Sequence, residues 1–304
     1  METSHLANIG KVDSDTAEAN KERDKKNYKE VYPVSADIRT ASPDFSPVLD
    51  RWKDIGWALL PEITLSPALN VALDQVLMAQ VASGTRPPTL RFWGWGGQAV
   101  ILGSFQSVRN EVDEVAAREM QVRIVRRMSG GGAMFVQPGL TITYSLYIPD
   151  ALLQGVSIAD SYAVCDSWVV AAFREVGVDA WYAPLNDITS AEGKIGGAAQ
   201  ARRPGVILHH TTIAYEMSAE EMLRVLRIGR EKLSDKGIAS AAKRVSPLRR
   251  QTDLPREQLV AHLITSFRHR FGLSETVLSP NDLEEATRLV TVKYDNDGWT
   301  HSLP

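Results

Sequence analysis

Apolar residues recur along the chain with two different spacings, one typical of helices and one typical of strands. Between residues 66 and 82 they recur at three- and four-residue intervals, and Ser66 followed by Pro67 is a common start signal, so a helix is predicted here. Between residues 141 and 147 apolar and polar side chains alternate, which predicts a half-buried strand.

Similar patterns predict further elements downstream. Further strands are expected at residues 89–95, 99–105, 122–127, around Lys194 and at 205–216. Further helices are expected at residues 112–120, 158–176, 219–226 and 256–271. The strands occur in clusters with helices between them, and not in strict alternation. The predicted fold class is therefore α+β, with mixed sheets flanked by helices.

The first 50 residues differ from the rest of the chain. They are rich in Asp, Glu, Lys, Asn and Ser, and they contain few apolar residues at regular spacing. Such a segment buries too little apolar surface to offset the entropy of the chain, so residues 1–50 are predicted to form a disordered tail. Residues 51–304 are predicted to form one folded domain.

Composition narrows the class of protein. The chain has 304 residues, 44% of them hydrophobic, and a formal net charge of −3. This near-neutral balance argues against general nucleic-acid binding, which needs a concentrated basic surface. No apolar run approaches the roughly 18 residues that span a bilayer, and the N-terminus lacks a signal-peptide pattern, so we expect a cytoplasmic protein without a membrane partner.

A glycine-rich run follows a predicted strand that ends in Arg126 and Arg127. It reads Ser129-Gly130-Gly131-Gly132, and its spacing matches neither a phosphate loop nor a dinucleotide fingerprint. A flexible hairpin is one interpretation. The other is a ligand site in which one arginine binds phosphate bidentately, while its neighbour faces the opposite way and lies at the surface.

Lys194 is followed by small or apolar residues, from Ile195 to Ala199. Most lysines are solvated, but a strand without bulky side chains packs poorly unless a ligand fills the space. A cation beside a strand surface without bulky side chains can neutralise the charge of a bound phosphate or carboxylate, which suggests an enzyme that handles an activated acid. Asn186 and Asp187, just upstream, could hold a metal-bound phosphate or Lys194 itself; both are also common turn residues.

The remaining candidate groups favour structural roles. His209 and His210 are adjacent on a predicted strand, so their side chains face opposite ways and cannot bind one ion from the same side. Cys165 is the only cysteine, which excludes an internal disulfide and a cysteine-built metal site. It lies on the apolar stripe of a predicted helix, where core packing is favoured over nucleophilic catalysis. We expect no resident metal ion.

The order of several motifs resembles the lipoate–protein ligases, within the biotin/lipoate protein ligase and octanoyltransferase superfamily. The resemblance extends from about Leu60 to near Trp299 and implies the catalytic-domain fold of that superfamily. The motifs that carry it are Asn70–Asp74, Leu90–Trp93, Arg126–Ala133, Asn186–Ile188, Gly193–Gln200, Leu208–Thr212 and Lys232–Ile238 followed by Arg244-Val245.

The resemblance implies a two-step reaction. Lipoate and Mg-ATP give lipoyl-adenylate, and the lipoyl group then passes to a lysine of a lipoyl domain or of a glycine-cleavage H-type protein. Lys194 matches the family lysine that stabilises charge at the acyl carbonyl and α-phosphate, and Arg127 matches the nucleotide-contacting arginine. The residues expected to bind nucleotide or acyl group are Arg127, Ser129, Gly130, Gly131, Gly132, Ala133, Met134, Phe135, Asn186, Asp187, Lys194, Gly196 and Ala198.

The chain also departs from the family pattern. Val136-Gln137-Pro138 replaces the polar residues usual after the glycine loop, and the extra C-terminal domain of many ligases is not expected, so a small accessory subunit is an open possibility. The alternative activity is octanoyl or lipoyl transfer without ATP. Relatives of that kind use a cysteine nucleophile, for which Cys165 is the only candidate. A biotin ligase is less favoured, because its arginine-rich loop is missing. A degenerate acyl-binding protein is the non-enzyme alternative.

Overall fold

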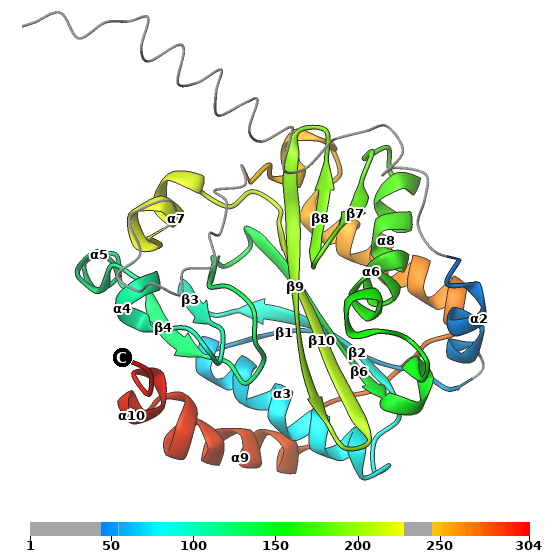
Figure 1. Cartoon of the computed structure of the whole chain (residues 1–304), viewed down its shortest axis with the longest axis horizontal. Coiled ribbons are helices and arrows are strands. Elements are labelled where there is room, and N and C mark those ends of the chain that lie inside the picture. Colours follow the sequence, from blue (N-terminus) through cyan, green and yellow to red (C-terminus); the bar gives the residue numbers. More distant parts are fainter. Residues whose placement is uncertain (1–43, 54, 228–244) are drawn as a thin grey trace, which may run out of the picture. The chain divides into compact units, whose positions relative to one another are not determined.

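The computed structural model describes residues 44–53, 55–227 and 245–304. An eight-stranded mixed sheet carries the fold from Phe45 onward, with its long strands β9 and β10 at the centre of Figure 1. Its strands, in spatial order, are β11 (Ser274–Glu275), β1 (Ala58–Leu65), β2 (Thr89–Trp95), β6 (Thr141–Pro149), β10 (Val206–Ala214), β9 (Gly193–Arg203), β8 (Asp187–Ser190) and β7 (Trp181–Ala183). A smaller sheet has the order β4 (Arg123–Arg126), β3 (Ala99–Leu102), β5 (Met134–Val136).

Helices cover both faces of the larger sheet. The helices of the described residues are α2 (Ser46–Leu49), α3 (Pro67–Ala82), α4 (Val108–Glu111), α5 (Glu114–Glu119), α6 (Ile158–Glu175), α7 (Ala219–Val225), α8 (Arg256–Phe271), α9 (Pro280–Leu289) and α10 (Asp297–Thr300). Short helical turns lie at Asp50–Trp52, Asp150–Leu153, Leu248–Arg250 and Val290–Tyr294. Helices α6 and α8 pack on one face, and α3 and α9 on the other (Figure 1). The sheet is therefore the middle layer of three.

Several predicted elements are confirmed. The helix expected at residues 66–82 is α3, and the Ser66 hydroxyl oxygen accepts a hydrogen bond from the Leu69 amide at its N-terminus (3.3 Å). The strand expected at 141–147 is β6, but it is not half-buried. Every residue from Thr141 to Ile148 is buried, because β6 lies between β2 and β10 and is covered on both faces. The helix expected at 112–120 is the shorter α5, because Val112 forms an isolated β-bridge with Leu226 and separates α5 from α4.

Two predicted segments lie partly or wholly outside the described residues. Of the tail expected at 1–50, residues 1–43 lie outside, whereas α2 and Phe45 pack against the core that α6 and α8 share. The motif Lys232–Ile238 also lies outside the described residues.

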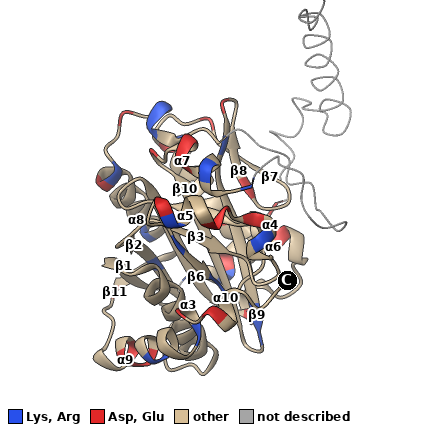
Figure 2. Cartoon of the chain, turned by 90° about the vertical axis from the view of Figure 1, so that its left-hand side faces the viewer, with Lys and Arg blue, Asp and Glu red and all other residues tan. Residues whose placement is uncertain are grey.

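Charge and hydropathy add two findings. Lys and Arg residues are interspersed with Asp and Glu residues on the helices and strands of Figure 2, and no single basic band is seen. No helix of the described residues is long and apolar enough to cross a membrane.

Candidate active site

The glycine-rich run connects β4 to β5, and Arg127 holds it in place. The guanidinium of Arg127 donates hydrogen bonds to the Ser129 hydroxyl (2.9 Å) and to the backbone carbonyls of Ile101 (2.8 Å), Gly130 (2.5 Å) and Gly132 (2.9 Å). Arg127 is buried, and burial lowers its pKa to about 10, so it stays protonated at neutral pH. Three of these four bonds go to the loop (Ser129–Gly132, the glycine loop) and the fourth goes to β3, so Arg127 ties the loop to the smaller sheet.

Arg126 is buried as well, which corrects the prediction that one of the two arginines lies at the surface. Its guanidinium donates to the carbonyls of Gly103 (3.0 Å) and Gln106 (2.5 Å), and to that of Thr300 in α10 (2.6 Å). The two arginines do face opposite ways, but chain segments cover both sides. The segment around α10 covers Arg126, and the spacing of residues in the sequence does not predict that this segment packs against β4.

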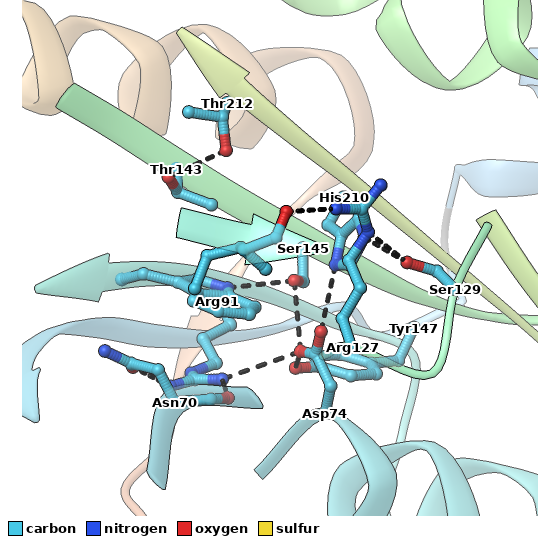
Figure 3. Close-up of polar contacts among 12 residues, drawn as sticks. Asn70, Asp74, Arg91, Arg127, Ser129, Thr143, Ser145, Tyr147, His210 and Thr212 are labelled. Carbon is cyan, nitrogen blue, oxygen red and sulfur yellow. Dashed lines mark hydrogen bonds and ion pairs between the residues drawn. The ribbon is translucent and has the colours of Figure 1, made fainter. Parts of the chain in front are cut away.

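The adjacent histidines enter two separate buried networks, as expected of side chains on opposite faces of a strand. His210 bonds Ser129 of the glycine loop through Nε2 (2.7 Å) and Asp74 of α3 through Nδ1 (2.9 Å), as Figure 3 shows. His209 bonds Asp166 of α6 (2.8 Å) and Gln200 of β9 (3.2 Å). The histidine pair thus connects the glycine loop and the lysine strand to opposite layers of helices.

Lys194 lies at the start of β9 and forms an ion pair with Asp187 of the neighbouring strand β8 (2.8 Å). The Lys194 side chain is 31% exposed and that of Asp187 only 6%. A Cβ atom added to Gly197 would lie 2.9 Å from the Lys194 ammonium nitrogen, so the ammonium group rests directly on bare backbone. Of the two roles considered for Asp187, the structure shows the one in which it holds the lysine.

The glycine loop contacts the same face of β9. A Cβ atom added to Gly131 would lie 3.3 Å from the Cβ atom of Ala199. Residues 197 and 199 share one face of the strand, because side chains alternate along it. The Lys194 ammonium and the glycine loop therefore meet one face of β9, and this juxtaposition makes the area a candidate active site.

The structure does not bring every predicted ligand-binding residue to this face. Ala198 pairs directly with Thr211, and the Thr211 hydroxyl donates to Asp166 of α6. Ala198, and with it Gly196, therefore lies on the face of β9 that α6 covers and not on the face of the glycine loop. Phe135 is buried in the core of the smaller sheet. The Asn186 side chain donates to the Ala198 carbonyl (2.6 Å). These four positions have packing or strand-bridging partners.

Gln137, one of the residues that replace the family's usual polar residues after the glycine loop, forms hydrogen bonds within the protein. Gln137 is buried, donates to Glu221 of α7 (2.7 Å), and accepts from the Ser218 amide that precedes this helix (2.9 Å). The Gln137 side-chain amide therefore holds the N-terminal end of α7 through two hydrogen bonds. Among the described residues no group of three or more His, Cys, Asp or Glu side chains is arranged to hold a metal ion.

Sequence reasoning missed the two buried carboxylates that anchor the histidines. Asp74 lies on a helix that is apolar on nearly every side, and Asp166 follows Cys165 on the apolar stripe of α6. A charged residue among buried apolar positions needs a polar partner, and that signal was present in the sequence.

We expect Gly197→Ala to lower activity by displacing the Lys194 ammonium while leaving the fold intact. The three atoms nearest to the added methyl group are Nζ and Cε at the far end of the Lys194 side chain (2.9 and 3.2 Å) and an Asp187 oxygen (3.5 Å). A misplaced charge near the reacting atoms costs on the order of tenfold to a hundredfold in kcat/KM. A double-mutant cycle with Lys194→Ala provides the check: additive losses would contradict an effect through the lysine.

Comparison with known proteins decides the family. The family model of the lipoyl protein ligase A/B catalytic domain matches residues 66–268. The chain belongs to the lipoyl protein ligase A/B family. This match includes both the glycine loop and the lysine strand, so the candidate site lies within the catalytic domain of the family.

Relatives and solved structures agree with this assignment. Octanoyltransferase LipM of Lysinibacillus sphaericus is 29% identical over 273 residues, which cover 80% of this chain and 98% of the relative. LipM of Symbiobacterium thermophilum is 29% identical over 272 residues, with 81% and 98% covered. A bi-partite lipoate protein ligase from Thermoplasma acidophilum, solved in a study of an archaeal lipoylation system and its E2 lipoyl domain, is 25% identical with a TM-score of 0.71, covering 82% of this chain and 98% of that one. The predicted fold of the lipoyl protein ligase A/B family is thus confirmed.

Proposed function

We propose that this protein transfers an octanoyl or lipoyl group from an activated donor to a lysine of a lipoyl domain. The observation that carries the proposal is the Lys194 ammonium, held by Asp187 over the backbone of Gly197 on the face of β9 that the glycine loop contacts. The relatives named octanoyltransferase support this class of reaction. The Thermoplasma ligase, described together with an E2 lipoyl domain, supports that type of acceptor.

In the proposed step, the neutral amine of the acceptor lysine attacks the acyl carbonyl carbon. The carbonyl oxygen gains negative charge, which the Lys194 ammonium stabilises. The C–N bond forms, the bond from carbonyl carbon to leaving group breaks, and the proton lost by the amine goes to the leaving group or to water. Asp187 fixes the ammonium beforehand, so little reorganisation is needed when charge develops.

We propose a thioester, octanoyl-acyl carrier protein, as the donor, in line with the name octanoyltransferase of the relatives. We propose direct transfer without an acyl-cysteine intermediate, because the single cysteine is unsuited to be a nucleophile. Cys165 is fully buried among core residues, and burial raises the pKa of its thiol well above the usual range. A buried, protonated thiol neither reaches a substrate nor attacks it.

ATP-dependent ligation is the second candidate function, and the same buried thiol favours it. An acyl-adenylate made from lipoate and Mg-ATP needs no enzyme nucleophile, so this route suits a site built on Lys194. In this case residues 51–304 would act as the catalytic domain, alone or with a small accessory subunit.

The two donors are distinguished by parallel reactions with one acceptor lipoyl domain. One reaction contains octanoyl-acyl carrier protein, and the other contains lipoate, Mg-ATP and, in a further sample, a candidate accessory subunit. Transferase activity predicts acylation in the first and no pyrophosphate release in the second. Pyrophosphate release that depends on lipoate would assign the ligase activity instead.

We expect Cys165→Ala to retain acyl transfer within about a factor of three, because the thiol lies in the core and not at the site. The expected cost is a modest loss of stability, about 1 kcal/mol in the free energy of unfolding. Steady-state rates and thermal unfolding measure the two effects. Loss of activity in a variant that keeps its unfolding temperature would show that the thiol takes part in the reaction.

A further inference from the structure

A continuous chain of hydrogen bonds runs from α3 to the glycine loop. Asp74 bonds His210, His210 bonds Ser129, and Ser129 bonds Arg127, which in turn holds the carbonyls of the loop (Figure 3). These four side chains are all buried, with Ser129 at 0% exposure. The chain resembles a serine–histidine–aspartate triad, but its serine is enclosed and already accepts from Arg127, so it is not placed to attack a substrate.

The bonds can be satisfied in only one direction. The carboxylate of Asp74 accepts, so Nδ1 of His210 carries the hydrogen. Burial lowers the pKa of His210, more than its hydrogen bond to Asp74 raises it, so the ring is neutral and its Nε2 accepts from the Ser129 hydroxyl. The lone pairs of that hydroxyl then accept the Nε hydrogen of Arg127.

This direction fixes how the glycine loop presents its backbone. The carbonyls of Gly130 and Gly132 point to Arg127, so the amides of the same two peptide groups, those of Gly131 and Ala133, point away from it. Within the described part of the chain no hydrogen-bond acceptor is recorded for these two amides. Backbone amides held in this way bind anionic oxygens.

We propose that Asp74, His210 and Ser129 act as a positioning relay, which orients Arg127 so that the glycine loop turns its amides toward the acyl carbonyl oxygen that gains negative charge in the proposed step. The expected effect on kcat/KM rests on the proposed acyl transfer, whereas the orientation of Arg127 by the relay does not. Ser129 is therefore a positioning residue, acting through Arg127.

A purely stabilising network is the competing interpretation, and Ser145 provides a matched control. Ser145 is also fully buried and donates to the other oxygen of Asp74 (3.2 Å), but it lies on β6 and has no contact with Arg127. Ser129→Ala and Ser145→Ala each remove one buried hydroxyl from the same network. Only the first interrupts the path to the loop.

The experiment compares both variants in the full chain by the ¹H–¹⁵N signal of Arg127 Nε and by kcat/KM. The relay predicts that Ser129→Ala shifts this signal, speeds its exchange with water, and lowers kcat/KM about tenfold to a hundredfold, whereas Ser129→Thr, which keeps the hydroxyl, restores most of the rate. Ser145→Ala should leave both readouts near wild type. Equal effects of the two alanine variants, or an unchanged Arg127 signal in Ser129→Ala, would overturn the proposal.

A pH titration of the wild-type protein tests the relay even if Ser129→Ala fails to fold. Asp74 bonds His210 directly, and Arg91 and Tyr147 in turn contact Asp74. The charges of Arg127 and of His209, on the opposite face of β10, also act on His210. Protonation of His210 removes the acceptor for Ser129, so the protection of Arg127 Nε against exchange, measured relative to a free guanidinium at the same pH, should fall as pH falls through the lowered pKa of His210, below 6.5 and before global unfolding. Protection that persists until the whole protein unfolds would refute the relay. The Arg127 Nε signal and its protection against exchange need no turnover, so a failure of the proposed function remains distinguishable from a failure of the relay.

Discussion

Lys194→Ala is expected to lower kcat/KM for acyl transfer by about 10²–10³ or more, the usual effect of removing a preorganised charge from a developing oxyanion. The ammonium group is the cation that β9 and β8 place over bare backbone, and its side chain is 31% exposed, so a substrate can reach it. The fold should persist, because the aliphatic part of the side chain is not buried in the core. Steady-state rates together with thermal unfolding measure both effects.

A second lysine provides the control. Lys53 forms an exposed ion pair with Asp50, and Lys53→Ala should leave the rates unchanged. A Lys194→Ala variant that retains more than about a tenth of the wild-type kcat/KM would contradict the assigned role. Lys194→Arg keeps the charge but not the shape of an ammonium, so we expect it to restore only part of the activity.

Gly103→Ala is expected to cause the largest loss of stability near the site. A Cβ atom at Gly103 would lie 2.0 Å from the Gly131 carbonyl oxygen, and both are backbone positions that cannot turn aside. The glycine loop must then move, which costs about 1–3 kcal/mol or more in the free energy of unfolding. Because the same movement disturbs the loop against β9, acyl transfer should fall with it. Chemical denaturation and steady-state rates measure these losses.

Gly97→Ala is the matched control for Gly103→Ala, because an added Cβ atom has space at Gly97. The nearest atom to an added Cβ there is the Pro67 side chain at 4.0 Å. Its free energy of unfolding should stay within about 0.5 kcal/mol of wild type. If Gly103→Ala were equally mild, the close approach of the two loops would not exist in solution.

The pattern of apolar positions predicted most of the long elements, although not strand β1 or helix α9, and it predicted the short edge strands poorly. Helix α8 and strand β2 begin and end at the predicted residues. Strands β7 and β11 have only two or three residues and were not predicted. Pairing with a neighbour, which sequence spacing does not reveal, defines such strands.

The candidate site was predicted in part, and one bulge explains the main error. Simple alternation from Lys194 points to Gly196 and Ala198 as its neighbours. In the structure Thr189 pairs with Lys194 but Ile188 pairs with Gly196, so Ile195 is an extra residue on β9. The bulge reverses the alternation and brings the Lys194 ammonium over the Gly197 face.

Side-chain partners far apart in sequence were beyond prediction for a different reason. Asp74 and His210 are 136 positions apart, and their contact depends on how α3 crosses the sheet. The sequence indicated that the two histidines face opposite ways, which the structure confirms. It did not indicate which carboxylate each one meets.

The intact mass of an acceptor lipoyl domain, measured after incubation with this protein and octanoyl-acyl carrier protein, tests the central claim most directly. The account predicts a mass gain of one octanoyl group on the acceptor, lost when the acceptor lysine is replaced and when the enzyme carries Lys194→Ala. An acceptor whose mass stays unchanged, both with this thioester and with lipoate plus Mg-ATP, would contradict it.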